Sequence, residues 1–338
     1  MRKSKLMLVL GLTMSLAMGC FAGCGSKGSV LKSSVRLENG EIKENSVVIK
    51  IGDIGIKYRT VKNYCYFLKQ QYEPVYGEKI WDYSISEKET VGGEAKQEII
   101  NMVSQIAIIK EEAKKEEIKL TNDEKDEATG RAEEMIKNAS DEDKKEYLLS
   151  VQSLSEVFAA NALAEKMFYL ATDDADTNVT EEEARQIRIQ YIHLITNGTK
   201  ENGTKVQLSE EEKKKTFQHA GTLLKEAQGV EDFASFAKSN TEDAQSEITI
   251  GKDSKQIDAA AVSAAFELAV GEYSPVIEGE TGYYIIRLVS DKDEDATYAR
   301  REEIIAERQT EMFQKKYKKW LGDADVDISK SFWKQFEI

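Results

Sequence analysis

The segment that decides the fold is "GYYIIRLVSD", Gly282 to Asp291, which follows the turn sequence "GEYSP". Successive side chains of an extended chain point to opposite faces, so Tyr284, Ile286 and Leu288 would share one face. The segment therefore predicts a short apolar strand with Tyr284 facing inward. Two interpretations of Tyr284 stay open here: a core residue, or a residue at the position of a catalytic group.

The segments before this strand predict a compact domain that mixes strands and helices. "IRIQYIHLIT" alternates from Ile187, which is typical of a strand, and Ser209 precedes a capped helix with Glu212 three residues on. Two short helices and another short strand follow in "VEDFASFAKS", "AAVSAAFELA" and "SEITIG". The order β-α-α-β-α-β within 187–290 predicts a small α/β domain with an antiparallel or mixed sheet.

Both flanks of this domain are helical in pattern. Residues 47–184 predict a mostly helical domain, in which Met102, Ile106, Ile109 and Ala113 recur at helical spacing. A final helix is expected from about residue 296 to 321. The closing "VDISKSFWKQFEI" is rich in aromatic residues, and we expect residues 294–338 to pack back on the N-terminal helices.

The N-terminus predicts export and lipid attachment. "MRKSK" is basic, residues 6–23 are apolar, and small residues precede Cys24, which a Gly/Ser linker follows. This pattern resembles a bacterial lipobox. Residues 1–23 would then be a signal peptide, Cys24 the lipidated first residue and 24–46 a tether, which places the protein on the outer face of the cytoplasmic membrane. The alternative is a plain N-terminal anchor helix.

Composition excludes several function classes. With 338 residues and a net charge of -14, the chain is long enough for two or three domains and gives no electrostatic support for binding nucleic acid. Cys65 is the one cysteine outside the targeting segment, so no internal disulfide is expected, and an inert buried thiol is the preferred interpretation. No metal-binding, phosphate-loop or nucleophile-elbow motif occurs, and we expect no cofactor and no metal.

The two histidines differ in their surroundings. His219 lies among Lys and Glu on a polar helix, where a solvated surface residue is expected. His193 lies on the apolar face of a strand. Taken alone, His193 is better interpreted as a hydrogen-bonded core histidine than as a functional one.

The order of these segments resembles the parvulin peptidyl-prolyl isomerases. "YIHLIT" matches their first strand, "EDFASFAKSNTED" a helix and loop, and "AAFELAVGEYSPVIEGETGYYIIRLVSD" their last helix, turn and strand. The resemblance covers about residues 187–291. It implies a parvulin-like domain over 185–293, with a four-stranded sheet plus helices.

The flanks resemble the extracytoplasmic foldases of the PrsA and SurA type. The matching stretches are "VVIKIGDIGIKYRTVKNYCYFL" and "EIINMVSQIAIIKEEAKKEEIKLTNDE". The resemblance implies an α+β protein with a mostly helical chaperone domain built from both chain ends and the parvulin-like domain inserted into it. Unfolded or nascent secreted polypeptides would be its partners, and a homodimer is compatible with this prediction.

The resemblance also indicates candidate site residues. His193 takes the place of the first parvulin histidine, Tyr284 that of the second, and Thr249 that of the acidic residue. The substrate-binding wall falls on Ile257, Ala261 and Phe266. Two of the three polar positions are thus changed, and the aromatic wall is reduced.

These changes predict weak or absent isomerase activity. Isomerisation has a barrier of about 18–20 kcal/mol and needs a dry pocket for the proline ring, with hydrogen bonds that favour the twisted amide. We therefore expect a membrane-anchored foldase that acts mainly by binding. The alternatives are a fully active parvulin isomerase and, from another class, a solute-binding or scaffolding surface lipoprotein.

Overall fold

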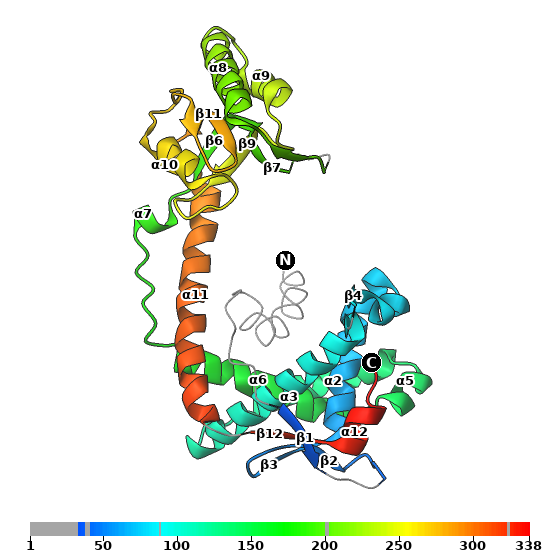
Figure 1. Cartoon of the computed structure of the whole chain (residues 1–338). Coiled ribbons are helices and arrows are strands. Elements are labelled where there is room, and N and C mark those ends of the chain that lie inside the picture. The colour runs from blue at the N-terminus through cyan, green and yellow to red at the C-terminus, as the bar shows by residue number, and fades with distance from the viewer. Residues whose placement is uncertain (1–32, 38–40, 88, 200–202, 323–324) are drawn as a thin grey trace. The chain divides into compact units, whose positions relative to one another are not determined.

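The computed structural model describes residues 33–37, 41–87, 89–199, 203–322 and 325–338 (Figure 1). The predicted signal peptide and the lipidation site at Cys24 lie outside these residues. None of the helices in the described ranges combines the length and the apolar character that crossing a membrane requires.

The chain divides into two compact units. The first, here called the helical unit, contains the chain up to Asp174 together with Thr310–Ile338, and the second, the inserted unit, is Ala175–Gln309. The sequence pattern predicts these borders at 184/185 and 293/294. The predicted α+β fold, with a helical domain made from both chain ends and an inserted domain, is confirmed.

The helical unit consists of long helices and small sheets. Its helices are α2 (Tyr58–Tyr76), η1 (Glu78–Asp82), α3 (Val91–Lys115), α4 (Asn122–Asn138), α5 (Asp141–Glu146), α6 (Val151–Ala171) and α12 (Lys330–Gln335). Its strands are β1 (Ser33–Leu37), β2 (Val47–Ile51), β3 (Ile54–Lys57), β4 (Ser84–Ser86), β5 (Glu89–Thr90) and β12 (Val326–Ser329). The helix α11 (Glu294–Leu321) begins in the inserted unit and ends in the helical unit.

Local signals explain where the helices of this unit begin. Thr121 and Glu124 form a capping box at α4, in which each side chain bonds to the backbone amide of the other residue. Thr90 accepts a hydrogen bond from the Gly93 amide at the start of α3. The predicted stripe of α3, which runs from Met102 to Ala113, is buried in the core of the unit.

One sheet of the helical unit joins the two chain ends. Its strand order is β1-β12-β2-β3, with β1 parallel to β12 and the other pairs antiparallel. The polar surroundings of residues 33–37 predict a tether, and for this segment the structure shows that prediction to be wrong. As β1 these residues pair with the edge of β12, whose backbone groups would otherwise lack partners on that side.

The core of the helical unit also unites both chain ends. Phe332 and Phe336 of the C-terminal segment lie in the same buried cluster as residues of α2, α3 and α6. Cys65 of α2 is fully buried in this cluster, and burial raises the pKa of its thiol to about 12. A thiol with so high a pKa is a packing residue rather than a nucleophile.

The inserted unit is a four-stranded antiparallel sheet with helices on both faces. The strand order is β10 (Ile277–Glu278), β11 (Gly282–Ser290), β6 (Ile187–Ile195) and β9 (Glu247–Ile250). The helix α10 (Ala259–Glu267) covers one face, and α8 (Glu210–Ala227) and α9 (Phe233–Asn240) cover the other (Figure 1). The remaining elements are the hairpin β7 (Asn197–Thr199) and β8 (Lys205–Gln207), and α7 (Glu181–Ala184).

Ion pairs attach the first part of α11 to the rest of the inserted unit. Arg300 pairs with Asp253 at 2.8 Å, and Arg301 pairs with Glu181 at 3.2 Å. Lys292, just before the helix, also contacts Glu181, at 2.7 Å. Exposed pairs of this kind contribute little singly, so their role is to orient the helix as a group.

Candidate functional site

The two central strands of the inserted unit bring the first predicted pair of site residues together. His193 of β6 lies directly opposite Tyr284 of β11 in the antiparallel register. Their rings stack at a centroid distance of 4.0 Å and an interplanar angle of 8°. The predicted juxtaposition of these two side chains therefore exists in the structure.

A carboxylate orients the histidine from the loop after α9. Both carboxylate oxygens of Asp243 lie 3.0 Å from His193 Nδ1. The same loop is held to β6 because the His193 amide donates to Thr241 Oγ1 and the Glu242 amide donates to the His193 carbonyl. A carboxylate accepts only, so Asp243 favours the histidine form with a proton on Nδ1.

Thr281 connects the other side of the histidine to a second carboxylate. Thr281 Oγ1 lies 3.2 Å from His193 Nε2, 2.9 Å from the Tyr284 hydroxyl and 2.8 Å from Asp258 Oδ2. The Thr281 amide also donates to Asp258 Oδ2, at 2.8 Å. Since Asp258 can only accept, the single hydroxyl hydrogen of Thr281 goes to Asp258, and the Thr281 oxygen is left to accept from the Tyr284 hydroxyl.

Tyr284 serves as a hydrogen-bond donor in this network. Burial raises the pKa of Tyr284 to about 12, so its hydroxyl keeps its proton at neutral pH. Its hydroxyl can therefore donate to Thr281 Oγ1. Tyr191, on the same face, also has a raised pKa, first because of its burial and then because of the neighbouring Asp243 charge.

Two glycines allow the chain to approach this closely. A Cβ at Gly282 would lie 2.1 Å from the Leu194 carbonyl oxygen and 2.8 Å from His193 Nε2. A Cβ at Gly279 would lie 2.2 Å from Asp258 Oδ2. Both positions must therefore lack a side chain for the network to form.

The two rings of the network are buried, whereas the side chains of Asp243, Asp258 and Thr281 are half-buried. His193 is 5% exposed and Tyr284 is 2% exposed. Of the predicted substrate wall, Ala261 of α10 is fully buried and Ile257 is 6% exposed, and both pack in the core between α10 and the sheet. Phe266 is partly buried against the same core, with the guanidinium of Arg185 5.4 Å from its ring centre and Lys252 Nζ 5.9 Å from it.

The structure does not bring Thr249 to this network. In the register of β6 and β9, Thr249 lies opposite Arg188, five positions along β6 from His193. Side chains alternate, so Thr249 also belongs to the other face of the sheet. The carboxylate beside His193 is instead Asp243, in the loop that follows the "EDFASFAKS" helix.

Sequence reasoning thus missed three members of the network: Asp243, Asp258 and Thr281. A usable signal existed for Asp243, because it is an acidic residue within the stretch "SNTED" and the expected partner of His193 was acidic. Asp258 and Thr281 gave no such signal, since their contact joins residues separated by the helix α10 and the strand β10. In the ranges that the structure describes, no group of three or more His, Cys, Asp or Glu side chains is placed to hold a metal ion.

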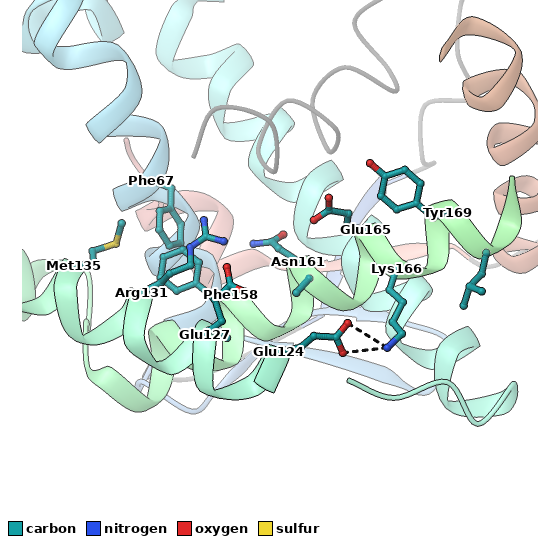
Figure 2. Close-up of a pocket in the computed structure, with 13 residues that line it drawn as sticks. Phe67, Glu124, Glu127, Arg131, Met135, Phe158, Asn161, Glu165, Lys166 and Tyr169 are labelled. Atoms are coloured by element: carbon teal, nitrogen blue, oxygen red, sulfur yellow. Dashed lines mark hydrogen bonds and ion pairs between the residues drawn. The ribbon is translucent and has the colours of Figure 1, made fainter. Parts of the chain in front are cut away.

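A second candidate site is a cavity in the helical unit. It has a volume of about 490 Å³ and lies among α2, α4 and α6 (Figure 2). Its apolar lining includes Phe67, Met135 and Phe158, and at one end Tyr169 and Leu170 are 50% and 52% exposed. This is one of the places where large apolar side chains of the helical unit meet solvent.

A comparison with protein families identifies most of the inserted unit. Residues 194–303 match the family model described as "PPIC-type PPIASE domain", which confirms the resemblance of this segment to the parvulins. No curated protein matches the chain.

Several solved structures are similar to the chain. The foldase protein PrsA from Streptococcus pneumoniae is 19% identical over 82% of this chain and 92% of its own, with a TM-score of 0.33. The peptidylprolyl isomerase PrsA from Bacillus cereus is 17% identical over the same shares, with a TM-score of 0.35. A structure described under SurA-like chaperones of Campylobacter jejuni is 14% identical over 85% of this chain and 100% of its own, with a TM-score of 0.28.

Proposed function

From the premise that residues 194–303 carry a PpiC-type peptidyl-prolyl isomerase domain, we propose that this chain is an extracytoplasmic foldase. It binds unfolded secreted polypeptides and assists their folding mainly as a chaperone, with weak or lost isomerase activity. Lipid on Cys24 anchors it to the outer face of the cytoplasmic membrane. The N-terminal sequence pattern supports this location.

The observation that carries the proposal is the burial of the His193 and Tyr284 rings. Catalysis of isomerisation needs hydrogen-bonding groups that can reach the twisted amide and a pocket for the proline ring. Here Asp243 and Thr281 occupy the hydrogen-bonding groups of the pair, and Ile257 and Ala261 of the expected wall lie within the core. A network of this kind supports a structural role for His193 and Tyr284. The domain would then act as a second binding surface.

One observation favours an active isomerase as the second candidate. His193 keeps a directly bonded carboxylate, Asp243, which fixes the orientation of the ring. A ring held in this way would be placed to hydrogen-bond to a substrate in an open site. The distinction therefore depends on access to the network and not on the identity of His193.

Replacing Tyr284 by histidine separates these two candidates. We expect Tyr284→His to leave prolyl isomerisation of a short proline peptide at the uncatalysed rate, because the buried Ile257 and Ala261 still offer no surface to the proline ring. The measurement is a protease-coupled assay on the full chain, with circular dichroism to verify folding. A clear gain of activity would show that a usable groove is present and that only the second histidine was missing.

An aggregation assay tests the proposed function itself. The full chain, at a concentration equal to that of a chemically unfolded client enzyme, should lower the light scattering that follows dilution from denaturant. An equal concentration of an unrelated acidic protein serves as control for charge effects. A solute-binding or scaffolding lipoprotein would leave the scattering unchanged, and that result would refute the chaperone proposal.

A further inference from the structure

The cavity of the helical unit carries charged groups as well as apolar ones. Three carboxylates line it, those of Glu124, Glu127 and Glu165, against two cations, Arg131 and Lys166 (Figure 2). Glu124 pairs with Lys166 at 3.0 Å, so these two charges neutralise each other. The remaining charges leave one carboxylate in excess within the cavity.

Glu165 is a carboxylate of the cavity that has no ion-pair partner among the described residues. Burial raises its pKa above the usual range, the Glu127 charge adds to this effect, and Arg131 opposes it. Within the described part of the chain, no ion pair forms with Glu165 or Glu127. The guanidinium of Arg131 instead lies 4.7 Å from the centre of the Phe158 ring, where it makes a cation–π contact.

Apolar surface adjoins this carboxylate along α6. Leu170 and Tyr169 are about half exposed at the end of the cavity, and Phe158 and Met135 line its interior. An extended peptide could place a bulky apolar side chain in the cavity while a neighbouring side chain reaches Glu165. Its own carboxylate-rich lining and the net charge of -14 disfavour a second copy of this chain or an anionic lipid surface as the occupant.

We infer that the cavity among α2, α4 and α6 binds extended client segments in which a bulky apolar residue stands next to a lysine or arginine. This inference rests on the proposed foldase function and adds its substrate class. The apolar side chain supplies most of the affinity by burial, and the cation pairs with Glu165 and supplies selectivity. Client segments of acidic character are rejected by the same carboxylate.

The test measures binding of labelled peptides to the full chain by fluorescence anisotropy. The probes are short fluorescein-labelled Gly/Ser peptides with a central Phe-Leu pair flanked by Lys, by Gln or by Glu. We expect the Lys peptide to bind about threefold more tightly than the Gln peptide, as for a partly exposed ion pair, and the Glu peptide to bind most weakly. Added salt should reduce the preference for Lys over Gln.

Two variants locate the binding to this cavity. Glu165→Gln should remove the preference for the Lys peptide and leave Gln-peptide binding within about twofold of the unchanged chain. Leu170→Ser should weaken both peptides about fivefold because apolar contact area is lost. Matched controls are Glu133→Gln, an exposed carboxylate on α4, and Val270→Ser, which is 59% exposed in the inserted unit; neither lines the cavity.

The outcomes separate this inference from the proposed function. Peptide binding that Glu165→Gln and Leu170→Ser do not change would overturn the inference, even if the chain still suppresses aggregation. A dimer in sedimentation that Leu170→Ser dissociates, or vesicle binding that it abolishes, would also overturn it by showing another occupant. Failure of the unchanged chain to suppress aggregation would instead refute the foldase proposal.

Discussion

Gly282→Ala is expected to destabilise the inserted unit by about 3 kcal/mol or more, at the upper end of the cost of overpacking. A Cβ at this position would lie 2.1 Å from the Leu194 carbonyl oxygen and 2.9 Å from its carbonyl carbon. Both atoms belong to the backbone of β6, which cannot move without breaking the pairing of β6 with β11. The new methyl group would also meet His193 Nε2 at 2.8 Å, so the network and the sheet should be lost together.

Hydrogen exchange measured by mass spectrometry checks this prediction, because it reports on each unit separately. Peptides from β6 and β11 should lose protection in Gly282→Ala, while peptides from α3 keep theirs. Gly221→Ala is the matched control: it lies in α8, and nothing within 4 Å would meet its new Cβ. The control should be neutral or more stable by about 0.5–1 kcal/mol, and unchanged protection in Gly282→Ala would contradict the described packing.

Phe332→Ala is expected to destabilise the helical unit by about 3–5 kcal/mol, the usual cost of removing a buried aromatic ring. Phe332 is fully buried, stacks on Phe336 at 4.6 Å and meets Tyr58 edge-on at 6.1 Å. Its loss would leave a cavity where the C-terminal segment packs on α2. The chain has three tryptophans, at positions 81, 320 and 333, and all of them lie in this unit.

Urea unfolding followed by tryptophan fluorescence is therefore specific for the helical unit. The midpoint for Phe332→Ala should fall well below that of the unchanged chain, with the same slope. Tyr83→Ala, at a residue that is 68% exposed, provides the control and should change stability by no more than about 0.5 kcal/mol. Equal midpoints for the two variants would show that the C-terminal segment is not part of this core.

The features that can be predicted from the sequence are those with a local period. The alternation in "IRIQYIHLIT" and "GYYIIRLVSD" indicates two strands, and the family resemblance pairs His193 with Tyr284. The same resemblance correctly indicates the insertion of one domain into another, because the matching segments follow each other in a known order. Fold class and the central pair are thus accessible from the amino-acid sequence alone.

The features that escape prediction depend on contacts without a local pattern. The predicted position of Thr249 beside His193 is wrong, because β9 pairs with β6 in a register that places Thr249 opposite Arg188. A strand as short as β9 carries no sequence signal for this register. The strand β1 is missed because its polar residues resemble a linker, and only β12, almost three hundred positions on, reveals its partner. The cavity cannot be separated from core packing, because periodicity does not say which apolar residues stay exposed.

The central histidine of the inserted unit contacts Asp243 and Thr281, and Thr281 is bonded in turn to Asp258. The Tyr284 hydroxyl donates to Thr281 within the same network. A polar network satisfied internally makes a core rigid and specific. Such a network supports our proposal that the domain binds clients and does not stabilise a twisted amide.

The most direct test of this account is the rate of prolyl isomerisation catalysed by the unchanged full chain. A protease-coupled assay with a proline peptide, with an active parvulin enzyme as the positive control, gives this rate while the aggregation assay is run on the same preparation. We predict suppression of aggregation together with isomerisation at or close to the uncatalysed rate. An isomerisation rate equal to that of an ordinary parvulin would contradict the account and would place an open catalytic groove at His193.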